Sequence, residues 1–264
     1  MTPAAADKGP EITYLGWSGF HMSGPGRSAV YIDPPKGTAF QDVPTVVFIT
    51  HGHPEHLGGV LDLLRCGNAS STTIVASGVV CRYLRRQCAD PGVRFEQVTV
   101  GSFFADGTGV RAEVFAWRHM PLLPPGIKPA CRHVWRLLRG WRKAMGIIRM
   151  MLAGPRRAGE MLGFVLSAGD NMPVIVYGEG LHRRTRLGEV RAVAGAFEQA
   201  CLLVAVEPED VAALPWLLRA SAARFILLYE PHGNWRDGFG MPRADLRALA
   251  TELKADGKRV RCVS

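Results

Sequence analysis

Hydrophobic and polar positions along the chain change their spacing several times, and each change marks a predicted element. Short apolar stretches between glycine-rich turns predict strands at residues 11–16, 19–23 and 28–33. The run Thr-Val-Val-Phe-Ile at residues 45–49 is continuously apolar, which is typical of a strand buried on both faces. Residues 57–64 then carry leucine and valine at helical spacing.

Strand and helix patterns alternate along the rest of the chain. We expect strands at residues 72–76, 94–99, 110–117, 162–168, 173–177, 201–206, 224–229 and 259–263. We expect helices at residues 77–88, 187–199, 208–220 and 242–255. Early strands followed by alternating units predict an α/β chain with two sheets covered by helices. Because no repeat, low-complexity tract or clear linker interrupts the pattern, we expect a single domain over residues 1–264.

One segment departs from this pattern and predicts a basic helical insertion at residues 121–160. Apolar side chains recur there at intervals of four and three residues, which places them on one face of a helix over residues 129–153. These side chains are Val134, Leu138, Trp141, Met145, Ile148 and Leu152. Gly140 and Gly146 weaken that helix by up to ~1 kcal/mol each.

Charge is concentrated in the same insertion. The chain of 264 residues has a formal net charge of +9, and residues 121–159 contain nine basic side chains and no acidic one. The remaining basic and acidic residues balance, so the basicity suggests a local role. Three roles fit the insertion: a cap helix that packs its apolar face on the protein, a peripheral membrane contact through residues 129–153, or a lid that places Arg132, Arg136 and Arg139 over an anionic substrate. Nucleic acid is disfavoured because the segment has few aromatic residues and no RNA-binding motif.

Composition is that of an ordinary globular protein, with 47% hydrophobic and 21% charged residues. No apolar run approaches the ~18–20 residues of a membrane span, and the first residues lack the pattern of a signal peptide. Six cysteines are scattered without a C-x-x-C pair, which favours thiols in a reducing compartment. We therefore expect a cytoplasmic location, with peripheral contact at the inner membrane surface if the insertion binds lipid.

The strongest chemical signal follows the apolar strand at residues 45–49. Within six residues the chain places His51, His53, Glu55 and His56. Imidazole nitrogen and carboxylate oxygen are ligands that zinc, iron and manganese accept. In an extended loop His51 and His53 project to the same side, and the turn that follows lets Glu55 and His56 reach a neighbouring point. One loop can therefore supply ligands to two metal ions.

This segment resembles the H-x-H-x-D-H motif of the metallo-β-lactamase superfamily, with Glu55 at the aspartate position. The opening of the chain, from Ile12 to Pro34, is similar to the branch that includes ascorbate-6-phosphate lactonase and phospholipase-D-like members, although Trp17 replaces a histidine common there. The resemblance implies a four-layer αββα sandwich with the basic insertion added. It also implies three further ligands, for which His119, Glu179 and His232 are the candidates. His21, His133 and His182 match no ligand position and are expected to be structural or surface residues.

The resemblance implies a cofactor of two divalent metal ions, with zinc expected first and manganese or iron as alternatives. His51, His53 and His119 would bind one ion, Glu55, His56 and His232 the other, and Glu179 would bridge them. Glu55 would also act as the catalytic proton relay. The implied activity is hydrolysis of an ester, lactone or phosphodiester in an anionic or lipid-like substrate. A di-iron oxygenase and a non-catalytic metal-binding or membrane-associated protein are the alternatives, the first because glutamate replaces aspartate twice.

Overall fold

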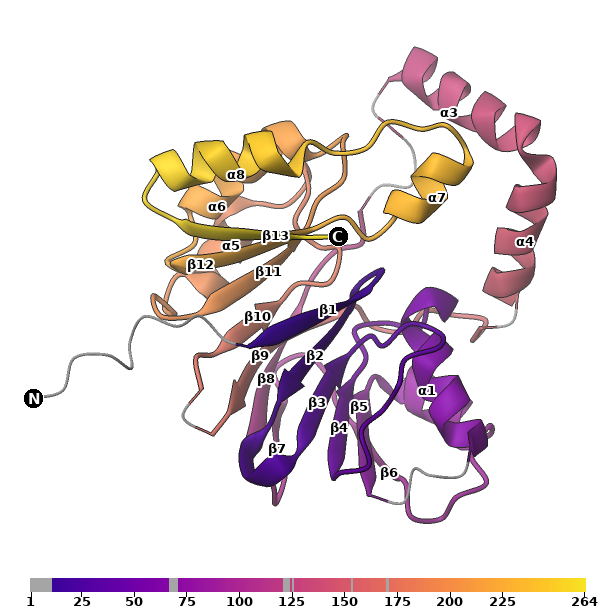
Figure 1. Ribbon diagram of the computed structural model, residues 1–264, viewed down its shortest axis with the longest axis vertical. Helices are drawn as coiled ribbons and strands as arrows, with labels where there is room; N and C mark the ends of the chain where they lie inside the picture. Colours follow the sequence, from indigo (N-terminus) through magenta and orange to yellow (C-terminus); the bar gives the residue numbers. More distant parts are fainter. Residues whose placement is uncertain (1–10, 67–70, 121–123, 125, 153, 170) are drawn as a thin grey trace, which may run out of the picture.

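The computed structural model describes residues 11–66, 71–120, 124, 126–152, 154–169 and 171–264. Parts of the predicted insertion, at 121–123, 125 and 153, lie outside the described residues, as does Asp170 between the predicted strands at 162–168 and 173–177. Two sheets face each other, and helices cover their outer surfaces (Figure 1). The α/β fold with two helix-flanked sheets, predicted from the sequence, is therefore confirmed.

The first sheet contains the amino-terminal strands in sequence order. Its strands are β1 (Ile12–Gly16), β2 (Gly19–Ser23), β3 (Ala29–Ile32), β4 (Thr45–Phe48), β5 (Thr72–Ala76) and β6 (Arg94–Gln97). β1, β2 and β3 pair antiparallel, and β3 to β6 pair parallel. The parallel part explains the continuous apolar run of β4, which is buried on both faces.

The second sheet contains the later strands. In spatial order they are β13 (Arg259–Val263), β12 (Phe225–Tyr229), β11 (Cys201–Ala205), β10 (Val174–Val176), β9 (Leu162–Ala168), β8 (Val110–Ala116) and β7 (Phe103–Ala105). β7 to β10 pair antiparallel, so the predicted strands at 162–168 and 173–177 form a hairpin, and β10 to β13 pair parallel. The short edge strand β7 has no hydrophobic pattern long enough to be predicted.

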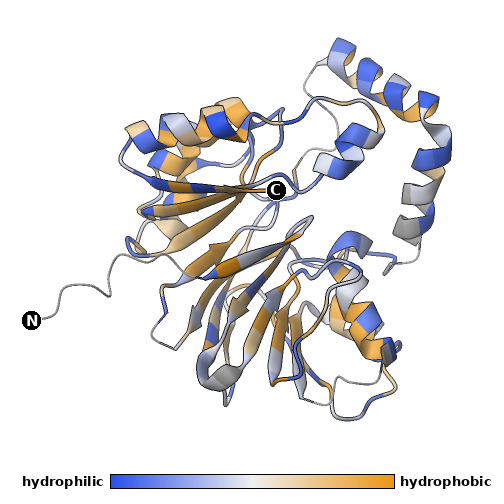
Figure 2. Ribbon diagram, in the orientation of Figure 1, coloured by the Kyte–Doolittle hydropathy of each residue, from blue (hydrophilic) through white to orange (hydrophobic). Residues whose placement is uncertain are grey.

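Apolar side chains from both sheets meet in the middle layer. The Phe48 ring lies 5.1 Å from that of Phe164 and 5.6 Å from that of Phe104, and the Phe20 ring lies 4.8 Å from that of Tyr229. These residues are buried within one cluster that spans the two sheets. The strands of both sheets are mainly hydrophobic in Figure 2. Burial of this shared layer fixes how the sheets stack, and so which strand ends meet.

Helices on the outer faces complete the four layers. On the first sheet lie α1 (Pro54–Cys66) and α2 (Gly78–Arg85), and on the second lie α5 (Leu187–Ala194), α6 (Leu214–Arg219) and α8 (Leu246–Ala255). Two short 3-10 turns, η1 (Pro25–Arg27) and η2 (Val211–Ala213), join elements. No helix within the described ranges is long and apolar enough to cross a membrane.

The insertion between β8 and β9 forms two helices and not the single predicted one. α3 (Ile127–Arg139) and α4 (Trp141–Leu152) meet at Gly140 and lie beside α7 (Gly233–Gly238), away from the sheets (Figure 1). A Cβ atom at residue 140 would come within 2.7 Å of the Phe239 ring, so glycine permits this close approach. Lys143 Nζ also donates to the Gly238 carbonyl at 2.7 Å. Contacts with α7 and Phe239 therefore accompany the interruption between α3 and α4. The apolar spacing of the insertion alone could not predict these contacts.

Packing of α1 on the first sheet generates a stability prediction. A Cβ atom at Gly59 would lie 2.6 Å and 2.7 Å from the Pro35 and Pro34 carbonyl oxygens, which are backbone atoms that a rotamer change cannot move. Gly59→Ala should lower the free energy of unfolding by about 1–3 kcal/mol, measured by urea denaturation. Gly188→Ala is the matched control, because that helical glycine has open space around it. Equal effects of the two substitutions would contradict this packing.

Candidate metal centre

Four strand ends of the two sheets deliver the candidate ligands to one place. β4 leads into the loop with His51 and His53, and α1 begins immediately afterwards. β8 leads to His119, β10 to Glu179 and β12 to His232. Each of these polar residues follows an apolar strand, so the sheets carry the hydrophobic burial while the ligands occupy the connections at one edge.

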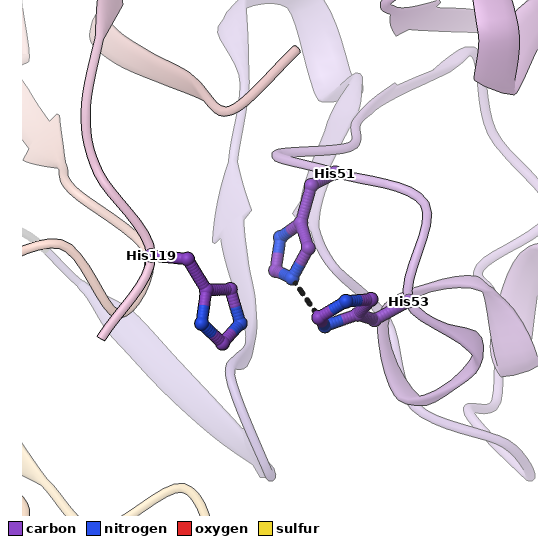
Figure 3. A group of neighbouring side chains, drawn as sticks. All are labelled: His51, His53 and His119. Atoms are coloured by element: carbon purple, nitrogen blue, oxygen red, sulfur yellow. Dashed lines mark hydrogen bonds between the residues drawn. The ribbon is translucent and has the colours of Figure 1, made fainter. Parts of the chain in front are cut away.

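His51, His53 and His119 form the first compact group (Figure 3). His51 Nε2 lies 2.9 Å from His53 Nδ1, and the His119 ring lies 4.9 Å from the His53 ring. One nitrogen from each histidine lies within 4.8 Å of the other two. His51 is fully buried, whereas His53 and His119 are partly exposed, so the group opens toward solvent on one side.

His51, His56 and Glu179 form the second compact group, and all three side chains are buried. Glu179 presents its two oxygens in different directions. Oε2 lies 3.4 Å from His119 Nε2, whereas Oε1 lies 3.4 Å from His232 Nε2 and 3.8 Å from His56 Nε2. The carboxylate therefore stands between the first histidine group and the His56–His232 pair.

A hydrogen bond at Nδ1 orients His51, and an ion-pair contact at Nδ1 orients His56. Thr50 Oγ1 donates its only proton to Asp33 Oδ2 at 2.6 Å, so at 3.0 Å it accepts from His51 Nδ1. His56 Nδ1 lies 2.9 Å from the same Asp33 oxygen. Both histidines therefore carry hydrogen on Nδ1 and turn Nε2 toward the centre, an arrangement typical of metal-binding histidines whose other ring nitrogen contacts a protein group.

His119 and His232 are held in the same way from the opposite sheet. His119 Nδ1 donates to the Met120 carbonyl at 2.9 Å, and His232 Nδ1 donates to Glu207 Oε1 at 2.7 Å. Glu207 is buried and is fixed in turn by Arg236, whose Nε donates to Oε2 at 2.8 Å. Four histidines thus turn their Nε2 atoms toward one small volume, where His56 Nε2 and His119 Nε2 have no hydrogen-bond partner among the described residues.

The charges around the centre favour a cation. Burial lowers the pKa of the His56 and His232 imidazoles, but the nearby carboxylates outweigh burial and raise both values to about 9. Asp33 is the main cause for His56, and Glu179 together with Glu207 for His232. Burial tends to raise the pKa of Glu179, but His232, His56 and His119 lower it overall. A proton or a metal ion can supply the positive charge that this buried set requires.

The backbone around the centre is closely packed. A Cβ atom at Gly178 or Gly180, on either side of Glu179, would lie 2.9 Å and 2.8 Å from the Trp117 side chain. Gly178 also has a φ of +56°, which favours glycine. Gly52, between His51 and His53, donates to the Ala158 carbonyl at 2.7 Å. The end of the insertion therefore packs directly on the histidine loop.

Sequence analysis placed most of these residues together, but Glu55 differs from the others. Glu55 lies in the first turn of α1, with Oε1 3.7 Å from His53 Nδ1, and it belongs to neither compact group. Its roles as a ligand and as a proton relay remain predictions.

His182 is structural as expected, because Nε2 bonds the Arg118 carbonyl and Nδ1 accepts from the Arg184 backbone N–H. His21 lies on β2, 4.8 Å from the Tyr31 ring, and His133 lies on α3.

Asp33 and Glu207, which contact His56 and His232, were not predicted from the sequence. Asp33 is buried and has a φ of +43°, an uncommon conformation for a residue other than glycine. Its position directly after β3, a strand that pairs with β4, was the available signal. Glu207 follows β11, but the chain around it resembles any strand end followed by polar residues. Trp17, at the position where a histidine is common in the resembled branch, has its ring 6.0 Å from that of His232.

Comparison with known proteins agrees with this architecture. Over 64 residues the chain is 38% identical to a UPF0173 metal-dependent hydrolase of Myxococcus xanthus (strain DK1622), and over 98 residues it is 34% identical to one of Alkaliphilus metalliredigens (strain QYMF). The matches cover 21% and 34% of this chain, and 23% and 40% of the relatives. The chain thus matches less than half the length of each relative. No protein-family model matches it.

Solved structures match nearly the whole chain. A protein of Parabacteroides distasonis ATCC 8503, provisionally named a metal-dependent hydrolase, aligns over 95% of this chain and 91% of its own with a TM-score of 0.60 and 15% identity. The metallo-β-lactamase fold protein YhfI of Bacillus subtilis aligns over 99% and 91% with a TM-score of 0.57 and 10% identity. The chain has the metallo-β-lactamase fold. This confirms the fold implied by the histidine motif, whereas the particular branch remains a prediction.

The raised pKa values generate a pH prediction for protein stripped of metal by a chelator. A folded-state pKa of about 9, above the unfolded value of 6.5, means that the native state binds protons more tightly. The stabilisation is complete below pH 6.5 and is lost as the pH rises through 9. We therefore expect the free energy of unfolding, measured by urea titration, to decrease as the pH rises from 6.5 to 9.

Asp33→Asn should reduce this pH dependence, because it removes the charge that raises the His56 pKa while an asparagine still tolerates a positive φ. Asp62→Asn is the matched control, because Asp62 is a partly exposed carboxylate on α1. If the free energy of unfolding of the unsubstituted protein did not change between pH 6.5 and 9, the carboxylates would not raise the pKa of His56 and His232 as described.

Proposed function

We propose that the chain is a metal-dependent hydrolase whose centre binds two divalent metal ions. The observation that carries the proposal is the fixed orientation of four buried or half-buried histidines around Glu179. Each has its Nδ1 atom occupied by a protein group and turns its Nε2 atom inward. The four imidazoles cannot stabilise one another through Nε2. Protonated rings repel each other, and neutral Nε2 atoms are all hydrogen-bond acceptors. Two bound metal ions would coordinate all four Nε2 atoms.

The two directions of the Glu179 carboxylate support a pair of ions. His51, His53 and His119 would hold the first on the Oε2 side, and His56 with His232 would hold the second on the Oε1 side. Bound divalent ions supply Lewis acidity, which lowers the pKa of water toward neutrality and stabilises developing negative charge. Zinc suits this nitrogen-rich set best, because imidazole nitrogens outnumber carboxylate oxygens. Asp33 and Glu207 would keep the histidines oriented.

An anionic substrate is supported by a cavity of about 280 Å³ between α3 and the end of the second sheet. Arg132 and Arg136, one helical turn apart, line it together with His133 and with Arg236, which is already paired with Glu207 and with Glu209, another lining residue. Neither Arg132 nor Arg136 has an ion-pair partner in the part of the chain that the structure describes, and paired guanidinium groups suit phosphate or carboxylate. Arg139 does not line this cavity, so its place in substrate binding rests on the sequence alone.

The cavity lies next to the metal centre. The Trp235 ring lies 6.0 Å from that of His133, which lines the cavity, and 6.1 Å from that of His232. Arg236 lines the cavity and also holds Glu207, the partner of His232. An ester, lactone or phosphodiester with an anionic group could therefore place that group against α3 while its scissile bond reaches the histidines.

Elemental analysis of the purified protein tests the metal centre. We expect about two equivalents of metal after reconstitution with zinc, and a clear loss in His53→Ala and Glu179→Ala. His21→Asn is the control, because His21 lies on β2 and outside both ligand groups.

Glu207→Gln should lower metal affinity by roughly 10–100-fold, because Glu207 orients His232 through its Nδ1 atom. Tight binding of iron in place of zinc would favour the oxygenase alternative, and no metal uptake at all would overturn the proposal.

Steady-state kinetics test the anionic substrate with two aryl probes. Arg132→Ala with Arg136→Ala should raise KM for mono(p-nitrophenyl) glutarate, an ester whose carboxylate is remote from the scissile bond, by about 10-fold or more, because charge-assisted hydrogen bonds contribute about 1.5–3 kcal/mol. Hydrolysis of neutral p-nitrophenyl acetate should not change. Arg247→Ala, on α8 and exposed, is the matched control. An equal loss with both probes would show that the arginines maintain structure and do not bind anions.

A further inference from the structure

The insertion helices carry most of the large exposed hydrophobic side chains in the described part of the chain. On α3 the exposed fractions are 83% for Ile127, 64% for Trp135 and 62% for Leu138, and on α4 Trp141 is 60% exposed. Val134 and Met145 are exposed as well. We call these six residues the outer face of the insertion. Exposed apolar side chains gathered on one side of a folded protein mark a surface that binds a partner or a membrane.

The polar side of α3 faces the protein instead. Arg132, His133 and Arg136 line the cavity beside Arg236, and the junction at Gly140 packs against Phe239. An amphipathic helix normally buries its apolar face against the body of its protein. Here the orientation is reversed, so the cap-helix interpretation of the sequence, with apolar side chains packed inward, is wrong for these residues. Contacts at the junction hold the helices in the reversed orientation, including the hydrogen bond from Lys143 to Gly238.

Positive charge surrounds the outer face. Lys128, Arg139, Arg142 and Arg149 are exposed on the same two helices, and residues 121–159 contain no acidic side chain. The Arg142 guanidinium lies 5.6 Å from the centre of the Trp141 ring, so charge and aromatic surface are adjacent. Tryptophan beside arginine on an amphipathic helix is typical of segments that lie in the headgroup layer of a membrane.

We propose that the outer face of α3 and α4 binds the surface of a membrane that contains anionic lipid. The apolar side chains would enter the boundary between headgroups and acyl chains, while the basic side chains would neutralise lipid phosphates. A second copy of this chain fits the face less well, because two such surfaces would bring like charges together, and neither α3 nor α4 contains an acidic residue to separate them.

Membrane binding through this face would place the candidate metal centre close to the lipid. The insertion begins shortly after His119, and its end packs on the histidine loop where the Ala158 carbonyl accepts from Gly52. The arginine-lined cavity lies on the other side of α3 from the outer face. The binding itself does not depend on the proposed hydrolase activity, so each can fail without the other.

Vesicle co-sedimentation of the full chain tests the proposal. We expect binding to vesicles of phosphatidylcholine with phosphatidylglycerol, weak binding to phosphatidylcholine alone, and weakening as salt rises. Trp135→Ser with Trp141→Ser should weaken binding to the anionic vesicles by at least ~10-fold. Trp216→Ser is the matched control, since Trp216 is 54% exposed on α6. Circular dichroism and metal content should match the parent protein, which shows that the variant folds.

A second pair of variants separates charge from apolar contact. Arg139→Glu with Arg142→Glu should weaken binding to the anionic vesicles, whereas Arg247→Glu on α8 should weaken it much less. Failure of the parent protein to bind anionic vesicles, or unchanged binding after the tryptophan substitutions, would overturn the proposal. So would a dimer of the parent protein in light scattering that the same tryptophan substitutions dissociate, because the face would then be covered by a second copy.

Discussion

A carboxylate buried among imidazoles is the constraint on which the rest of the site depends. Glu179 is nearly inaccessible to solvent, and ionisation in such a place is costly unless positive charge surrounds it. Histidines from both sheets meet this requirement, since His56 follows a strand of the first sheet and His119 and His232 follow strands of the second. The contacts of one side chain thereby join the two halves of the sandwich at the edge where the apolar middle layer ends.

Asp33 and Glu207, which contact the candidate ligands, connect the site to both sheets. Asp33 bonds the Thr50 backbone and hydroxyl and contacts His56, so the ends of β3 and β4 and the start of α1 share one carboxylate. Its positive φ is maintained because three contacts, two from Thr50 and one from His56, hold the carboxylate at that point. On the other sheet Glu207 connects His232 to Arg236, and Arg236 also bonds Glu209 and the Pro242 carbonyl. The ligands therefore stand on rigid supports.

Much of the fold and several site residues could be predicted from the sequence because local patterns report them. Period-two and continuous apolar runs identified most strands, and the clustered histidines identified the loop after β4. Long-range partners were harder to predict. Glu207 and Asp33 acquire their roles only when the sheets stack, and no spacing in the chain records that event. The insertion shows the same limit: its apolar periodicity was correct, but periodicity states which residues share a face and not which side that face turns to.

The place where the insertion joins the sheet has a consequence for how the fold tolerates change. β8 and β9 pair antiparallel from Val110 with Ala168 to Ala116 with Leu162, so the segment between residues 116 and 162 starts and ends at neighbouring backbone positions. A loop closed at its base leaves strand register untouched whatever its length, and its entropy cost grows only slowly with length. This pair of strands can therefore carry insertions of different length and surface chemistry while the buried layers beneath it stay the same.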